Sequence, residues 1–175
     1  MALTPLTIPS QVVTYPAPFD AMTAFCSAQT LTATGYFNNL NSGQIDLGGP
    51  SPVSAVGRTD FIWSMDVTAC DMSSNDESYK LNLFGSNDVA FGNGNVELLA
   101  FHDLAAVTAG RQVATILGAS PTIPPTNLAG TIIQLPATNL MQRIYYRYLR
   151  MYLVAAGTTP SITLTSWISR AEVKF

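Results

Sequence analysis

The stretch that decides the fold is RYLRMYLV, at residues 147–154. Its residues alternate between an apolar set and a polar or aromatic set: Leu149, Met151 and Leu153 against Tyr148, Arg150 and Tyr152. A period of two is typical of a β-strand with one buried face. Turn-forming residues follow at 155–160, including Gly157 and Pro160, and Ser161–Ile168 then alternates again. The sequence therefore predicts an antiparallel hairpin, onto which the earlier strands are laid.

Earlier stretches carry the same β-type pattern between segments rich in Gly, Pro and Asn. We expect a short helical turn over Asp20–Ala28, whereas Leu104–Leu117 suits either a strand or a helix. Strands are expected over Gln29–Thr34, Gln44–Leu47, Phe61–Cys70, Tyr79–Phe84, Val96–His102 and Thr131–Leu135. Inward positions in the two clearest of these are Phe61, Trp63, Met65 and Val67, and Tyr79, Leu81 and Leu83.

This count of about eight strands, with almost no helical periodicity, predicts an all-β protein, an antiparallel β-sandwich or barrel. The jelly roll is the eight-stranded form with long corner loops. The pattern alone does not separate a jelly roll from an immunoglobulin-like sandwich.

The first 20 residues differ from the rest of the chain. Four prolines, at positions 5, 9, 16 and 18, keep this segment extended. It is nevertheless too apolar for a solvated tail. We expect an extended arm over residues 1–20 and a single domain over residues 21–175. The arm either packs on its own domain or reaches a neighbouring subunit through Ile8, Val12, Val13 and Tyr15.

Charge is scarce in this chain. Of 175 residues, 11% are charged and 47% are apolar, whereas about 25% charged is usual. A surface so poor in charge favours contact with other proteins over life as a dilute monomer. The net charge of -3 argues against a nucleic-acid partner. We also expect no membrane-spanning helix and no signal peptide.

The charges that exist are unevenly distributed. Acidic residues gather over residues 60–103, whereas arginines dominate from residue 104 onward. One interpretation is solvated faces of different sign. The other is complementary patches that set the register between subunits.

Residues suited to catalysis are sparse. His102 is the only histidine, and Asp103 beside it would face the other side of a strand, so the two cannot pair as in a catalytic triad. Cys26 and Cys70 lack the close spacing of a zinc site. We expect them to be buried free thiols, which suits a protein made in a reducing cytoplasm. We therefore expect no enzyme, no catalytic residue and no cofactor.

Two loops rich in Asp and Asn, at residues 71–77 and 87–95, offer oxygen ligands of the kind that calcium prefers. Their spacing does not fit an EF-hand loop. Such loops usually form turns, so we assign no metal site.

Tyrosine and arginine cluster at residues 143–152. Four of these residues are expected to share one strand face: Tyr146, Tyr148, Arg150 and Tyr152. This face could pack under a loop, with arginine extending to water. It could form a protein interface, because Tyr and Arg are enriched at binding hot spots. It could also stack carbohydrate, as in lectin-like sandwiches.

Three segments, in this order along the chain, resemble phage capsid cement (decoration) proteins of the Bbp16 type. The first joins DAM (20–22), SAQTLTAT (27–34) and QIDLG (44–48). The second is LNLFGSNDVAF (81–91), and the third joins YLRMY (148–152) to AGTTP (156–160). The resemblance implies a jelly-roll-like sandwich that binds the outside of a capsid and stabilises contacts between major capsid subunits.

The resemblance also implies partners and a location. The expected partners are the major capsid protein and the chain itself, as a homodimer or homotrimer. The expected location is the outer capsid surface of the virion, after synthesis in the host cytoplasm. Two other functions stay open: a carbohydrate-binding sandwich of a phage fibre or surface lectin, and a jelly-roll capsid protein that assembles by itself.

Overall fold

The computed structural model describes residues 21–48, 57–71, 73, 76–92, 96–104 and 131–170. Within these residues the chain is all-β and contains no α-helix. Two 3-10 turns occur, η1 (Ala21–Thr23) and η2 (Asn41–Gly43). Neither is long and apolar enough to cross a membrane. The strands are β1 (Ala24–Leu31), β2 (Gly35–Tyr36), β3 (Gln44–Asp46), β4 (Asp60–Cys70), β5 (Ser78–Ser86), β6 (Val96–Leu104), β7 (Thr131–Thr138), β8 (Leu140–Met141), β9 (Ile144–Tyr145), β10 (Tyr148–Ala156) and β11 (Ile162–Arg170).

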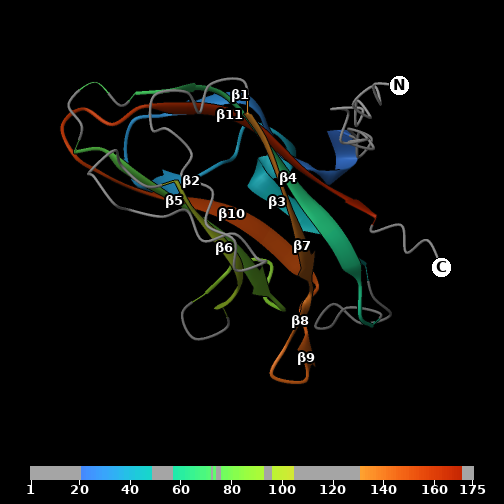
Figure 1. Ribbon diagram of the computed structural model, residues 1–175. Helices are drawn as coiled ribbons and strands as arrows, with labels where there is room; N and C mark the ends of the chain where they lie inside the picture. The colour runs from blue at the N-terminus through green and yellow to red at the C-terminus, as the bar shows by residue number, and fades with distance from the viewer. Residues whose placement is uncertain are drawn as a thin grey trace, which may run out of the picture.

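Two antiparallel sheets form a sandwich (Figure 1). The first sheet has the order β1-β11-β4-β7. The second has the order β2-β10-β5-β6, and β3 also pairs with β10. β8 and β9 pair only with each other among the described strands. The prediction of an all-β antiparallel sandwich is confirmed at this level.

The core lies between the two sheets and follows the predicted alternation. In β10, Leu149, Met151 and Leu153 are fully buried. The inward positions predicted in β4 and β5 are also buried, namely Phe61, Trp63, Met65 and Val67, and Tyr79, Leu81 and Leu83. Apolar side chains at every second position give each sheet one face to bury, and burying that face drives the two sheets together.

The polar group of Trp63 is satisfied inside this core. Its indole Nε1 donates a hydrogen bond to Ser166 Oγ at 3.0 Å. The Ser166 hydroxyl in turn donates to the Ser64 carbonyl oxygen at 3.0 Å. A large aromatic ring therefore fills the centre of the first sheet without leaving its N–H unpaired.

The predicted closing hairpin is wrong. β10 pairs with β2, β3 and β5 in the second sheet, whereas β11 lies between β1 and β4 in the first. The loop between them crosses from one sheet to the other, and Gly157 adopts φ +109 there, beside the backbone of Glu77. Alternation defines the two faces of a strand but not its neighbours, so it could not distinguish this crossover from a tight hairpin.

The start of the domain also differs from prediction. Of the stretch Asp20–Ala28, where a helical turn is expected, the described residues form a 3-10 turn at Ala21–Thr23, and β1 already begins at Ala24. The side chains of Ala24, Phe25 and Cys26 are fully buried, so packing against the core favours the strand over a longer turn.

Candidate interaction surface

The outer face of the second sheet gathers aromatic side chains from four strands. Three predicted residues of β10, Tyr148, Arg150 and Tyr152, point to this side, opposite to the buried Leu149 and Met151. The strand register places further residues beside them. We call the set the aromatic face: Tyr36, Lys80, Phe84, Phe101, Tyr148, Arg150, Tyr152 and Val154.

Tyr152 lies at the centre of this face. Its ring meets Tyr36 edge-on, with ring centroids 4.7 Å apart and planes at 62°. Phe84 lies on its other side, at 6.0 Å and 56°. These tilted arrangements suit the quadrupoles of the rings and add to the stability that burial provides. The three rings therefore form one ordered cluster.

Cationic side chains lie over the rings. The Arg150 guanidinium is 4.6 Å from the Phe91 ring centroid and 5.5 Å from that of Tyr36. Lys80 lies 4.5 Å over Phe101. Cation–π attraction stabilises each pair. Arg150 Nε is buried and has no hydrogen-bond partner among the described residues, so the rings supply its main contacts.

One part of the aromatic face is covered and the other is open. The loop at 87–92 brings Phe91 over Arg150, and the Asp88 carboxylate holds this loop by accepting hydrogen bonds from the backbone N–H groups of Ala90 and Gly92. Tyr148 is only 7% exposed. At the open part, Tyr36 is 38% exposed, Val154 41% and Phe101 53%. These three side chains lie on β2, β10 and β6, so apolar surface is exposed at several places across this face, which makes the face a candidate interaction site.

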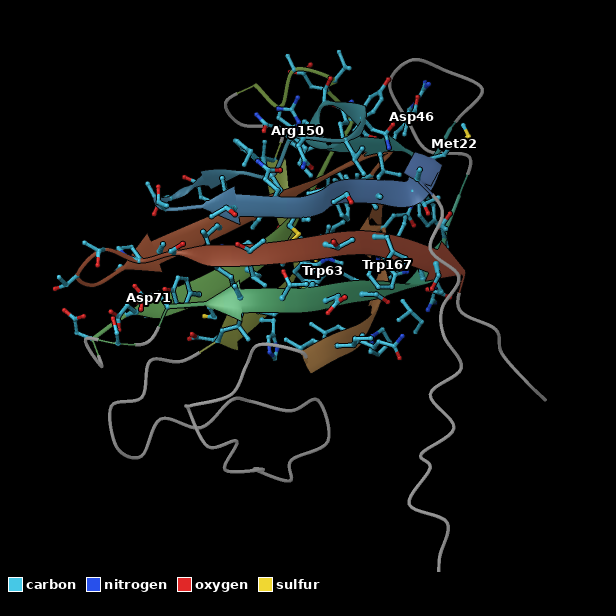
Figure 2. The ribbon with its side chains drawn as sticks, turned by 90° about the horizontal axis from the view of Figure 1, so that it is seen from above. Met22, Asp46, Trp63, Asp71, Arg150 and Trp167 are labelled. Carbon is cyan, nitrogen blue, oxygen red and sulfur yellow. The ribbon has the colours of Figure 1, made fainter. Side chains whose placement is uncertain are left out.

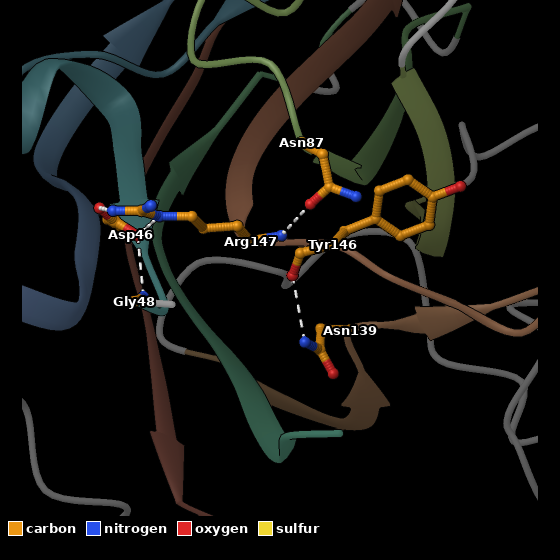
Figure 3. Close-up of polar contacts among 6 residues, drawn as sticks. All are labelled: Asp46, Gly48, Asn87, Asn139, Tyr146 and Arg147. Carbon is orange, nitrogen blue, oxygen red and sulfur yellow. Dashed lines mark hydrogen bonds and ion pairs between the residues drawn. The ribbon is translucent and has the colours of Figure 1, made fainter. Parts of the chain in front are cut away.

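Tyr146 does not share this face. An added Cβ on Gly85 would lie 2.8 Å from Tyr146 Cβ, on the side of β5 that carries Leu83 into the core. Figure 3 shows the Tyr146 ring and the Arg147 side chain pointing in opposite directions. Strand β10 begins only at Tyr148, so the alternation does not extend back to Tyr146. The predicted alignment of Tyr146 with the other three residues is therefore wrong, and its ring is 8% exposed.

An ion pair fixes Arg147 at the edge of the aromatic face. Its guanidinium donates to both carboxylate oxygens of Asp46, at 2.7 and 2.8 Å, and lies 5.0 Å from the Tyr148 ring centroid. The hydrogen bonds from Arg147 hold the pKa of Asp46 below its usual range, and the N–H of Gly48 adds to this effect. Figure 2 shows that Asp46 and Arg150 lie at the same side of the molecule.

Two asparagines hold the segment that leads into β10 (Figure 3). Asn87 accepts a hydrogen bond from the backbone N–H of Arg147 at 2.9 Å and donates to the Tyr145 carbonyl at 3.0 Å. Asn139 is fully buried, and its amide donates to the carbonyls of Tyr146 and Gly57. Its Oδ1 accepts from the Thr59 N–H at 2.7 Å. Each side-chain amide therefore joins two chain segments.

The residues considered for catalysis lie apart from this surface. His102 is buried on the inner side of β6, opposite Leu81, and burial lowers its pKa. Asp103 lies on the other side of the strand, which confirms that the two cannot pair. Cys26 and Cys70 are free thiols, but Cys70 is only half-buried; burial raises their pKa values to about 12 and about 11. Both thiols are therefore protonated at neutral pH.

Within the described residues, no group of three or more His, Cys, Asp or Glu side chains is placed to hold a metal ion. The predicted arm residues Ile8, Val12, Val13 and Tyr15 lie outside the described residues. Comparisons of the chain with protein-family models, curated proteins and solved structures found no match.

Proposed function

We propose that this protein is a structural virion protein, a capsid cement or decoration protein that binds the outside of a phage capsid. The observation that carries the proposal is the open part of the aromatic face. The outer face of a two-layer antiparallel sandwich normally carries polar side chains, whereas here Tyr36, Phe101 and Val154 expose large apolar groups. The low charge of the chain and the three segments that resemble cement proteins support the same function.

We further propose that the sandwich is a jelly roll. One set of its strand pairs is nested, because the first strand pairs with the last and each later strand pairs further inward. These pairs are β1 with β11, β2 and β3 with β10, β4 with β7, and β5 with β6. Such nesting is what results when one long antiparallel hairpin is rolled into two facing sheets.

The proposed mechanism is burial of the aromatic face against major capsid subunits. The rings of Tyr36, Phe84 and Tyr152 are already ordered by their mutual contacts, so binding fixes few additional rotamers. On a capsid lattice, many weak contacts act together through a high effective concentration. A homodimer or homotrimer on a symmetry axis would add further contacts, as would the N-terminal arm.

The geometry gives less support to carbohydrate binding. Sugars stack on an open aromatic ring face, whereas Lys80 lies over Phe101 and Arg150 lies over Tyr36. Cations placed on the rings are compatible with a protein partner, for which Arg and aromatic residues together are typical of the interface core.

The test is the copy number of this chain in purified virions of the virus that encodes it. Quantitative mass spectrometry against the major capsid protein should give a ratio near one copy per capsid subunit. A handful of copies per particle would instead indicate a tail or fibre and would favour the carbohydrate function. Closed particles formed by the purified chain alone would replace the cement function with that of a shell protein.

A further inference from the structure

A small hairpin projects from one end of the sandwich. It consists of β8 and β9, and we call residues 139–146 the finger. In Figure 1 the finger extends past the ends of the main strands. It also exposes apolar surface, because Ile144 is 48% exposed and Tyr145 is 40% exposed.

The base of the finger is held firmly. Asn139 is fully buried, and its backbone accepts a hydrogen bond from the Tyr146 N–H at 2.9 Å while its own N–H donates to Thr59 at 3.2 Å. Asn87 binds the Tyr145 carbonyl from the opposite side. A protruding hairpin with so many fixed contacts at its base presents its tip in a defined position, which lowers the entropy cost of binding.

The tip of the finger is strained. Gln142 and Arg143 form the two-residue turn, with φ of 50 and 69. A hairpin turn with positive φ at both positions favours Asn-Gly, because each longer side chain costs roughly 1–2 kcal/mol in this conformation. The chain thus carries a long polar side chain and a long cationic one where stability alone would favour short residues. Strained positions of this kind cluster at functional sites, which makes the tip a candidate for binding.

One charge that is unpaired among the described residues lies at the tip of the finger, and one of the opposite sign lies beside its base on β6. Arg143 is exposed at the tip and makes no hydrogen bond or ion pair with any described residue. Glu97 lies on β6 opposite Gly85, against which Tyr146 at the base of the finger packs. Its carboxylate likewise has no hydrogen bond or ion pair among the described residues. The finger therefore carries a free cation at its tip and a free carboxylate beside its base.

We propose that the finger is an interface between two copies of this chain. Two fingers packed antiparallel about a two-fold axis place Arg143 of each copy beside Glu97 of the other. The tip lies three residues from the base at Tyr146, which corresponds to about 10 Å in an extended strand. The same pairing covers apolar surface on one face of each finger, at Ile144 or at Tyr145, whose side chains lie on opposite sides of β9. Such a contact is isologous, because both copies use the same surface: Arg143 of one copy meets Glu97 of the other, and the reverse contact also forms.

This inference rests on the proposed function in one respect. A cement protein brings many copies to neighbouring lattice positions, where a modest contact between two copies becomes effective. The contact itself needs no capsid, so it is tested on the purified full chain. If the chain does not self-associate, the proposed capsid binding is unaffected. If it does not bind capsids, the proposed contact between two copies is unaffected.

The experiment measures the dimer dissociation constant by sedimentation velocity at low and at high salt. The wild type should form dimers that weaken as salt is raised. Arg143→Glu and Glu97→Arg should each weaken the dimer about tenfold or more, because each creates two like-charge contacts. The double variant Arg143→Glu/Glu97→Arg should restore the dimer. Thr159→Glu, in an exposed loop, is the control and should leave the dimer unchanged.

Three outcomes would overturn the proposal. A wild-type chain that stays monomeric at every concentration at low salt excludes the interface. If neither single charge reversal weakens the dimer, the dimer interface lies elsewhere on the molecule. Failure of the double variant to recover, with circular dichroism unchanged from the wild type, excludes the pairing of Arg143 with Glu97.

Discussion

The two outer faces of the sandwich carry few charges, and they differ in which other side chains they present and in the contacts that these side chains make. The outer face of the first sheet carries threonines, and their hydroxyls bond within the sheet. Thr30 Oγ1 lies 2.7 Å from Thr163 Oγ1, Thr68 Oγ1 donates to the Thr163 carbonyl, and Thr165 Oγ1 accepts from the Ala28 N–H. The outer face of the second sheet instead carries rings and cations that pack on one another.

This difference is the reason why we propose the aromatic face, and not the threonine face, as the binding surface. Threonine is β-branched and suits an exposed strand, and its hydroxyl can bond to the sheet or to water. The threonine hydroxyls therefore suit a face that stays in solvent, although Ile132, which pairs with Asp66 of β4, is also 55% exposed there. The aromatic face leaves carbon surface in water at Tyr36, Phe101 and Val154, and only a partner can remove that surface from water.

The largest expected effect concerns capsid binding. Phe101→Ala and Tyr36→Ala should each weaken binding to capsids that lack this chain by about 2 kcal/mol, the range of aromatic hot spots. Co-sedimentation with such capsids measures the affinity. Thr68→Ala, on the threonine face, is the matched control and should bind as the wild type does.

Weaker capsid binding by Phe101→Ala would not be explained by unfolding. Because Phe101 is 53% exposed, its loss should change the free energy of unfolding little. Equal binding by the wild type and both aromatic variants would remove the aromatic face from the interface. Weaker binding by Thr68→Ala alone would assign the contact to the threonine face instead.

A smaller effect is expected on stability. Thr163→Val keeps the branched shape but removes the hydroxyl that bonds to Thr30. Because this contact is exposed, the free energy of unfolding should fall by about 0.5 kcal/mol, at the low end for a hydrogen bond. Urea denaturation measures the change, with Thr32→Val in an exposed turn as the control. A loss of capsid affinity in Thr163→Val without a change in stability would contradict a purely structural threonine face.

The faces of individual strands could be predicted from the sequence. Burial of every second residue in β4, β5 and β10 needs only the local pattern, because successive side chains of a strand point to opposite sides. The same rule correctly predicted that the side chains of His102 and Asp103 lie on opposite sides of β6. It failed at Tyr146, which lies between β9 and β10, where the period of two no longer applies.

Contacts between strands could not be predicted in this way. Tyr36, Phe84 and Phe101 are far apart in the sequence, and only the register of four strands brings them to Tyr152 and its neighbours. The finger could not be predicted from the sequence either, because strands of two residues are too short to show a period of two. Its turn lacks the Asn-Gly pair by which such hairpins are recognised.

The smallest expected effect concerns the ion pair beside the aromatic face. Arg147 holds the pKa of Asp46 below its usual range. Since the folded-state pKa is the lower one, the pair stabilises the fold above the unfolded pKa of about 4, and this stability is lost as pH falls through the folded-state value. The Asp46 side chain is 44% exposed, so solvent screening limits the effect to a few tenths of a kcal/mol.

Asp46→Asn isolates this contribution. Urea denaturation should find the variant slightly less stable than the wild type at pH 7, and the difference should shrink as the pH falls below the unfolded pKa and through the lowered folded-state pKa of Asp46. A difference that did not change as the pH was lowered would mean that the carboxylate charge is not its cause. The hydrogen bonds that Asp46 makes with Arg147 and Gly48, and not its charge, would then account for its contribution to stability.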